Sequence, residues 1–312
     1  MPVAAPEKSE HLAAGSEHLA ARSERGAAGS EHRSAGAEHG TAVTRVGVVR
    51  YINTLPLIHG LGRVKGMALV PDVPSRLVDR LSEGDVDLAL CSVVDAVRAP
   101  VPVRIVPVGM LGCSGPTLTV RLYSRVPWER VRTLAADTDS HTSRALAELV
   151  LRRRFGADVQ VVDFARASGG RDPGTDAMLM IGDKVIADAP AAGAWPHEMD
   201  LGEAWHAWTG LPFVFATWLA RDRMDESAAA RVRTAARVLD HQRRHNRERI
   251  DAIVAREAAP HGWPAGVARH YLADLLRFDL DARAREGLAR FFAECAAVGL
   301  LPRAEVPADL DW

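Results

Sequence analysis

Short apolar runs that alternate with longer amphipathic segments constrain the fold of this chain most strongly. Strand-like runs rich in Val, Leu, Ile, Met or Phe lie at residues 45–49, 86–90, 117–123, 176–181 and 213–216. Helix-like segments separate them, such as residues 73–83, which end at Gly84, and residues 144–155. Strands that alternate with helices in this way are typical of α/β proteins. We therefore expect an α/β fold.

The last third of the chain is predicted to be helical. Apolar residues recur with a period close to 3.6 between residues 226 and 258, which indicates one long amphipathic helix. Whether this helix is broken near His245 and Asn246 stays open. Two more helices are expected at residues 267–276 and 282–298, and Gly299 with Pro302 gives a stop signal for the last one.

Composition excludes several classes of protein. The 312 residues are 47% hydrophobic and carry a formal charge of -1, which is ordinary for a globular chain and gives no field that attracts nucleic acid or an anionic membrane. Three widely spaced cysteines, Cys91, Cys113 and Cys295, form neither a disulfide framework nor a thiolate metal site. We expect a protein of the reducing cytoplasm, with no metal and no nucleic-acid partner.

Residues 1–44 differ from the rest of the chain. Ser-Glu-His or a variant of it recurs every seven residues from Ser9 onward, and Ala and Gly fill the gaps. A coiled coil needs two apolar positions per heptad, whereas Leu12 and Leu19 are the large apolar residues within these repeats. The sequence therefore predicts a disordered tail. No apolar core of a secretory signal and no membrane-spanning run is found, so we expect no membrane association.

Loops with small polar residues follow or precede several predicted strands. In open α/β sheets ligands bind at the carboxyl ends of strands, where a loop enters a helix. The loop residues at such places are Asn53, Ser92, Ser114, Gly115, Asp183 and Thr209, together with residues 139–143, which open the helix at 144–155. Hydroxyls at a helix start suit a carboxylate or a phosphate, although an ordinary helix cap gives the same pattern. The loops predict a polar cleft that accepts an anion, and they leave its ligand open.

Several of these segments together resemble one known family. The segments are YINTLPL at residues 51–57, Ser114-Gly115-Pro116, residues 139–143, LMIGD at 179–183, DLGEAW at 200–205 and TGLPFVFA at 209–216. In this order they are similar to the chorismate dehydratases of the futalosine route to menaquinone. The resemblance runs from about residue 45 to about residue 302, and the tail has no counterpart in it.

This resemblance implies a two-lobed fold like that of the type II periplasmic binding proteins, with the ligand between the lobes. It places one lobe at residues 45–115 and 216–312 and the other at residues 116–215. It also implies loss of water from chorismate, a small dicarboxylate, to give 3-[(1-carboxyvinyl)oxy]benzoate, without a cofactor because aromatisation supplies driving force. We expect a monomer or a weak homodimer.

Carried over to the matching positions, the resemblance makes Asn53 and Ser92 the candidate catalytic residues beside the reacting ring. It implies that the substrate is bound by a second set of residues: Ser114, Gly115, Ser140, Thr142, Ser143, Asp183 and Thr209. Since no strong base lies in these motifs, one of the substrate's carboxylates is the expected proton acceptor.

Two residues depart from the family pattern or have no assigned role. Lys184 stands where a small residue is expected. Its side chain either pairs with a substrate carboxylate or projects into solvent, and the sequence leaves both possibilities open. His141 lies within the Ser/Thr loop, and whether it reaches the ligand stays open.

Three other functions compete with this hypothesis. The fold also serves solute receptors, which bind without catalysis. The dihydroxynaphthoate synthase of the same pathway shares it as well. A dehydratase-like paralogue for another cyclic carboxylate is the third, because one fold supports several chemistries.

Overall fold

The computed structural model of the chain describes residues 43–164, 174–190 and 193–311. Except for its last two residues, the predicted disordered tail lies outside these residues. Thr44, which we assigned to the tail, is the first residue of strand β1.

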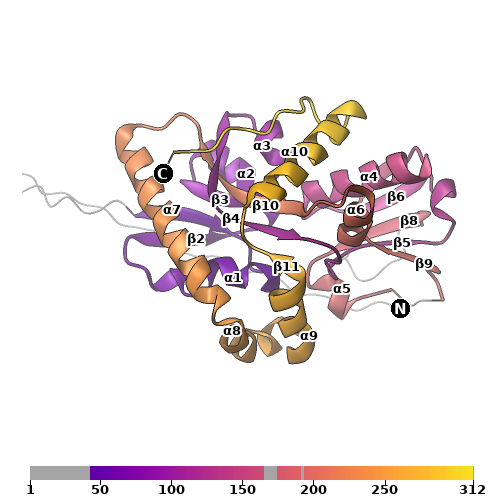
Figure 1. The fold of residues 1–312 in the computed structure, drawn as a ribbon, viewed down its shortest axis with the longest axis horizontal. Coiled ribbons are helices and arrows are strands. Elements are labelled where there is room, and N and C mark those ends of the chain that lie inside the picture. The colour runs from indigo at the N-terminus through magenta and orange to yellow at the C-terminus, as the bar shows by residue number, and fades with distance from the viewer. Residues whose placement is uncertain (1–42, 165–173, 191–192, 312) are drawn as a thin grey trace, which may run out of the picture. The chain divides into compact units, whose positions relative to one another are not determined.

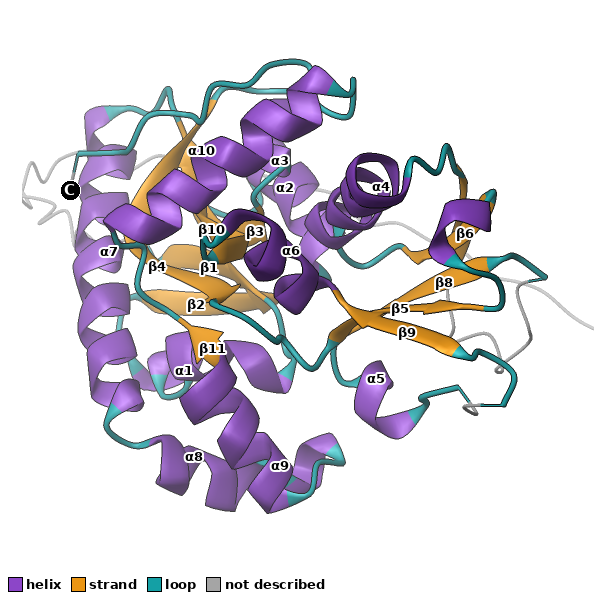
Figure 2. Ribbon diagram, turned by 45° about the vertical axis from the view of Figure 1, so that its right-hand side comes forward, coloured by secondary structure: helices purple, strands orange, loops and turns teal. Residues whose placement is uncertain are grey.

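Two separate β-sheets form the framework (Figure 1, Figure 2). In the described residues the first sheet has the strand order β11-β4-β10-β3-β1-β2. Its members are β1 (Thr44–Val48), β2 (Met67–Pro71), β3 (Leu88–Ser92), β4 (Val103–Cys113), β10 (Phe213–Arg221) and β11 (Leu276–Arg277). Strand β1 runs parallel to β2 and β3, whereas β10 is antiparallel to β3 and β4.

The second sheet has the order β7-β6-β8-β5-β9 within the described part of the chain. Its strands are β5 (Val120–Ser124), β6 (Thr133–Asp137), β7 (Gln160–Phe164), β8 (Ala177–Ile181) and β9 (His197–Asp200). Strand β6 is parallel to β7 and β8, and β5 is antiparallel to β8 and β9.

Helices cover both faces of the first sheet. They are α1 (Leu55–Ile58), α2 (Pro74–Glu83), α3 (Asp95–Arg98), α7 (Glu226–Arg247), α8 (Ile250–Glu257), α9 (Ala265–His270) and α10 (Ala282–Ala297). Val46 and Leu88 pack with Leu239 of α7, and Ala89 packs on the other face with Leu77 of α2. Burial on both faces explains why β3 is a continuously buried run rather than an alternating one.

Three further helices accompany the second sheet, as Figure 1 shows. They are α4 (His141–Phe155), α5 (Lys184–Ala187) and α6 (Leu201–Thr209). The long helix α4 packs on β8 and α6, and it also contacts α10 and β10 beside the first sheet. Its start therefore lies where the two sheets approach each other.

The chain passes between the two sheets twice. Residues 114–119 lead from β4 to β5, and residues 210–212 lead from α6 to β10. The contacts between residues group residues 41–312 into one compact unit and do not divide it into lobes. The lobe boundaries at 115/116 and 215/216 therefore stay a prediction. Strand β10 begins at Phe213, three residues before the expected second boundary.

Asp200 ties the first connection to the start of α6, and the end of α6 leads into the second connection. Its carboxylate accepts hydrogen bonds from the backbone N–H of Thr117 and Leu118 at 2.7 to 3.0 Å, and it caps α6 through the N–H groups of Gly202 and Glu203. A Cβ on Gly202 would lie 2.3 Å from a Thr117 methyl carbon, so only glycine allows this close approach.

Most predicted elements are present, and three differ. The long C-terminal helix is divided close to the break that the sequence left open at His245 and Asn246, since α7 ends at Arg247 and α8 begins at Ile250. The strand expected at residues 117–123 begins only at Val120, because Asp200 holds the backbone of residues 117 and 118, and Leu118 has a φ of 65°. The helix expected at residues 267–276 becomes a π-helical turn, Tyr271–Leu275, and then the short strand β11.

Candidate active site

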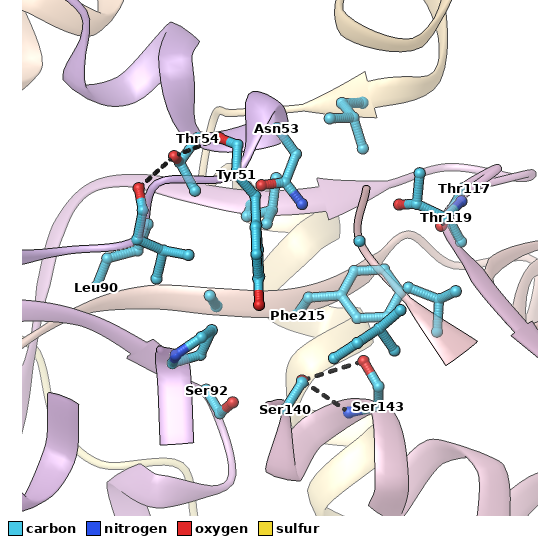
Figure 3. Close-up of a pocket in the computed structure, with 18 of the residues that line it drawn as sticks. Tyr51, Asn53, Thr54, Leu90, Ser92, Thr117, Thr119, Ser140, Ser143 and Phe215 are labelled. Carbon is cyan, nitrogen blue, oxygen red and sulfur yellow. Dashed lines mark hydrogen bonds between the residues drawn. The ribbon is translucent and has the colours of Figure 1, made fainter. Parts of the chain in front are cut away.

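A cavity lies at the carboxyl ends of β1 and β3, facing the start of α4 and the end of β8 (Figure 3), and its empty space of about 600 Å³ includes open solvent at its mouth. Its apolar wall includes Val49, Leu90, Leu111, Ile181 and Phe215. Its polar residues carry hydroxyl or amide groups, and they are Tyr51, Asn53, Thr54, Ser92, Thr117, Thr119, Ser140, Ser143 and Tyr271. None of the described residues that line it carries an ionised side chain at neutral pH. The cavity can hold an apolar ring whose polar substituents meet neutral hydrogen-bonding groups.

Asn53 is positioned by a tight turn after β1. The Thr54 hydroxyl donates to the carbonyl oxygens of Val49 and Tyr51 at 2.7 and 2.9 Å, and this fixes the 3₁₀ turn Ile52–Thr54. Ile52 is fully buried beneath the turn. The turn therefore places the Asn53 amide at the cavity wall.

Asn53 and Ser92 each place an unpartnered polar atom in the cavity wall. Asn53 Oδ1 and Ser92 Oγ are buried and have no hydrogen-bond partner in the structure, and Ser92 is only 1% exposed. Leaving such an atom unpaired costs about 1–3 kcal/mol, so a folded protein normally avoids it unless a ligand supplies the partner. The structure therefore brings both predicted catalytic residues to one cavity and leaves them available to a ligand.

The start of α4 forms the opposite wall. Ser140 is the helix cap, and its Oγ accepts from the Ser143 N–H at 3.2 Å and lies 3.1 Å from Ser143 Oγ. Both hydroxyls line the cavity (Figure 3). The sequence left open whether this segment is an ordinary helix cap or part of a ligand site. It is a helix cap, and the same serines also face the candidate site.

Thr142 and Thr209 are not among the residues that line the cavity, and their predicted contacts with the substrate stay predictions. Thr142 is completely buried, and its Oγ1 lies 3.5 Å from the backbone nitrogen of Val94. Thr209 lies at the end of α6, where its hydroxyl donates to the carbonyl oxygen of Trp205 and accepts from the Leu211 N–H. The Thr142 hydroxyl thus faces the backbone of a distant segment, and the Thr209 hydroxyl serves the backbone of its own helix end.

Ser114, Gly115 and Asp183 are also absent from the cavity lining. Ser114 is exposed, and Gly115 has a φ of 124° in the first connection between the sheets. Asp183 follows Gly182, which does line the cavity, but its Oδ2 lies 3.4 Å from the backbone nitrogen of Ile52. Burial raises the pKa of Asp183. Substrate contacts for these three residues stay predictions.

Lys184 faces neither the cavity nor open solvent. Its Nζ lies 2.5 Å from Asp137 Oδ2 and 2.8 Å from Asp139 Oδ2. Burial opposes the charge of Lys184, but the two carboxylates outweigh it and raise the lysine pKa. The same Asp139 oxygen accepts from the Tyr51 hydroxyl at 2.6 Å, and the Asp139 carbonyl accepts from the Ser75 N–H at 3.2 Å. The lysine therefore neutralises a cluster that connects the two sheets beside the cavity.

His141 likewise binds a carboxylate across the two sheets. Its Nδ1 lies 2.7 Å from Oδ1 of the buried Asp95, at the start of α3. The hydrogen bond that His141 donates to Asp95 raises the pKa of His141, and burial raises the pKa of Asp95. His141 does not line the cavity.

Sequence reasoning missed several residues of the cavity wall. Tyr51 lies within the YINTLPL segment, and its ring extends into the space between Asn53 and the two serines of α4 (Figure 3). Thr117 and Thr119 belong to a segment that we expected to be strand. Tyr271 lies in a segment that we expected to be an ordinary amphipathic helix. Only Tyr51 carried a signal, which is its place beside Asn53 in a specific segment.

The sequence of residues 44–297 matches the model of a family described as menaquinone biosynthesis. This chain belongs to that family. It is also 30% identical, over 273 residues, to a chorismate dehydratase of Thermus thermophilus, with 82% of this chain and 96% of that protein covered.

Solved structures show the fold. The periplasmic aliphatic sulphonate binding protein of Escherichia coli superposes with a TM-score of 0.58 at 17% identity, covering 86% of this chain and 94% of that one. A Candida albicans protein with the generic periplasmic binding protein fold also gives 0.58, at 12% identity, with 86% and 98% covered. The chain therefore has the two-lobed periplasmic-binding-protein-like fold that the resemblance implied.

The described residues hold neither a cluster of metal ligands nor a membrane-spanning helix. They contain no group of three or more His, Cys, Asp or Glu side chains placed to hold a metal ion. Among those same residues, no helix combines the length and the apolar character needed to cross a bilayer.

Proposed function

We propose that this protein is a chorismate dehydratase, which removes water from chorismate to give 3-[(1-carboxyvinyl)oxy]benzoate. The observation that carries the proposal is the pair of unpartnered atoms, Asn53 Oδ1 and Ser92 Oγ, in an otherwise largely apolar cavity. The similarity to a chorismate dehydratase over nearly the full length of that relative supports it.

The reaction needs a proton acceptor and a way for hydroxide to leave. The ring C–H gives up its proton, its electron pair forms the new ring double bond, and the neighbouring C–O bond breaks. The hydroxide leaves as water once it takes a proton, so atoms and charge balance. The ring becomes aromatic, and this supplies driving force without a cofactor.

In this proposal a group of the substrate itself, rather than a side chain of the protein, accepts the proton. No carboxylate, histidine or lysine is present among the described residues that line the cavity. A carboxylate of chorismate therefore takes the ring proton and passes it to the leaving hydroxyl. Asn53 and Ser92 orient these groups, and they act chiefly through position because a well-placed group saves entropy in the transition state.

The other substrate carboxylate is assigned to the start of α4. Ser140 and Ser143 offer hydroxyls there, and the free N–H groups of the first turn favour an anion. Burying a dianion among neutral donors suits a reaction in which charge must move within the substrate.

The wider setting follows from this activity. We place the reaction in the futalosine route to menaquinone, in the cytoplasm, with the enzyme acting as a monomer or a weak homodimer. The two lobes, at residues 45–115 with 216–312 and at 116–215, close on the substrate.

Incubating the purified protein with chorismate tests the proposal. We expect a product that is lighter than chorismate by the mass of one water molecule and that shows the ultraviolet absorption of a substituted benzoate. Binding of chorismate without turnover would favour a solute-binding protein instead. Turnover of a later pathway intermediate, but not of chorismate, would favour the dihydroxynaphthoate synthase.

A further inference from the structure

Tyr271 is a completely buried tyrosine whose hydroxyl reaches the cavity wall. It is 1% exposed and opens the π-helical turn Tyr271–Leu275. Its hydroxyl lies 2.5 Å from Thr119 Oγ1, and its ring stacks on the Trp263 indole with centroids 5.0 Å apart and planes 11° apart. Single π-helical turns inside helices are frequent at functional sites. The ring is thus held on one face and the hydroxyl at one end.

The hydroxyl of Tyr271 also contacts Asn53. Both residues line the same cavity, and an interaction with the Asn53 side chain partly offsets the effect of burial, which raises the pKa of Tyr271. In Figure 3 the amide nitrogen of Asn53 points to the side on which Thr119 lies, and the amide oxygen points away from it. That oxygen is the atom without a partner.

We propose that Tyr271 is a positioning residue that fixes the orientation of the Asn53 amide, so that Asn53 presents a hydrogen-bond acceptor to the substrate. The inference rests on the proposed function. An asparagine amide can turn by 180° and exchange its donor for its acceptor. Tyr271 prevents this by occupying the nitrogen, and Thr119 holds the tyrosine hydroxyl in turn.

The orientation decides which substrate group Asn53 binds. An amide oxygen repels a carboxylate, because both are acceptors, and it binds an O–H group. Asn53 therefore receives the ring hydroxyl of the substrate, which is the group that leaves, and selects cyclic carboxylates that carry a hydroxyl at this position. The carboxylates are directed to the α4 wall, where N–H and O–H donors lie.

The first experiment compares Tyr271→Phe with the wild type, using chorismate turnover. We expect kcat to fall about tenfold, the equivalent of one hydrogen bond, with KM changed less than threefold. Tyr123→Phe is the matched control, because Tyr123 is a buried tyrosine of β5 that does not line the cavity. It should keep the wild-type kcat.

A double substitution separates positioning from general damage. In Asn53→Ala the group that Tyr271 positions is gone, so adding Tyr271→Phe should lower kcat by less than twofold. A full further tenfold loss in the double variant would overturn the proposal, since Tyr271 would then act independently of Asn53. An unchanged kcat in Tyr271→Phe alone would overturn it as well.

A binding measurement gives a readout that does not need turnover. We compare the affinity for chorismate with that for its analogue in which hydrogen replaces the ring hydroxyl. The wild type should prefer the hydroxyl compound about tenfold, and Tyr271→Phe should lose most of this preference. An equal preference in both proteins refutes the inference. A wild type that binds both compounds but never turns chorismate over refutes the proposed function instead.

Discussion

The two walls of the cavity differ in how their polar groups are satisfied. On the wall of the first sheet, Asn53 Oδ1 and Ser92 Oγ are buried without partners. On the α4 wall, Ser140 and Ser143 bond to each other and complete the helix cap. The first wall is built at a cost in stability, whereas the second is stable by itself.

This difference suggests that the first wall takes part in the reaction, whereas the α4 wall binds the substrate. A group left unpaired in the folded protein loses nothing when the reacting atoms arrive, so it can strengthen its interaction in the transition state. A capping serine already has a partner and adds a bond to an anion without being reorganised. We therefore expect substitutions on the first wall to change kcat and substitutions on the second to change KM.

The largest effect is expected on the first wall. Asn53→Ala and Ser92→Ala should each lower kcat by about 100-fold or more, while chorismate affinity changes only a few-fold. Steady-state kinetics and calorimetric binding measure the two effects separately. If either variant kept near wild-type kcat, that residue would lose its assigned role and the two walls would no longer differ in function.

The next effect concerns the α4 wall. Ser143→Ala should raise KM about tenfold, because a hydrogen bond to a charged group is worth about 1.5–3 kcal/mol, and kcat should stay nearly constant. Ser227, near the start of α7, is the matched control, since it lies in the first turn of a helix away from the cavity. A kcat loss in Ser143→Ala with unchanged KM would reverse our assignment of the walls.

Thr142 tests whether the whole helix start takes part. Thr142→Val keeps the shape but removes the hydroxyl that faces the Val94 nitrogen. The free energy of unfolding should fall by about 1 kcal/mol, and KM should not change. Urea denaturation and kinetics check both parts. A raised KM would mean that this hydroxyl turns toward the ligand, as the sequence predicted.

The smallest effect is a pH dependence of stability from His141. The Asp95 carboxylate raises the folded-state pKa of His141 against the opposing charges of Arg98 and Arg144. A raised pKa stabilises the protein below the unfolded pKa, about 6.5, and this stabilisation is lost as pH rises through the folded pKa. Asp95 acts in the same direction, since burial and Asp79 raise its pKa.

We therefore expect the contribution of the His141–Asp95 pair to the free energy of unfolding to decrease as pH rises above about 6.5, so that the pH dependence of stability differs between the wild type and His141→Gln. The effect is modest because the His141 side chain is 38% exposed. Urea titrations at several pH values measure it. An equal slope in both proteins would show that the pair does not bind α4 to the first sheet.

The framework could be predicted from the sequence because its signals are local. Buried strands such as β3 and β8 are short, mostly apolar runs, and capping residues and glycines mark the ends of α2 and α4. The positions of Asn53 and Ser92 followed from the rule that ligands meet strand ends, together with the family segments.

The remaining part of the site depends on contacts between distant segments. Tyr271 reaches the cavity only because a π-helical turn and the Trp263 stack place it there, and neither has a sequence signature. Lys184 could not be assigned without knowing that Asp137 and Asp139 end a neighbouring strand. Thr142 and Ser143 are adjacent in sequence, but the helix directs one to the backbone of Val94 and the other to the cavity.

Asp200 has a mechanical consequence for the molecule. One carboxylate ties the first connection between the sheets to the start of α6, which leads into the second. Gly202 and Thr117 are packed so closely that the two segments have no room to move relative to each other at this point. Because α6 leads into the second connection, this tie couples the two connections through one short helix, so we expect the lobes to turn about one axis rather than to slide.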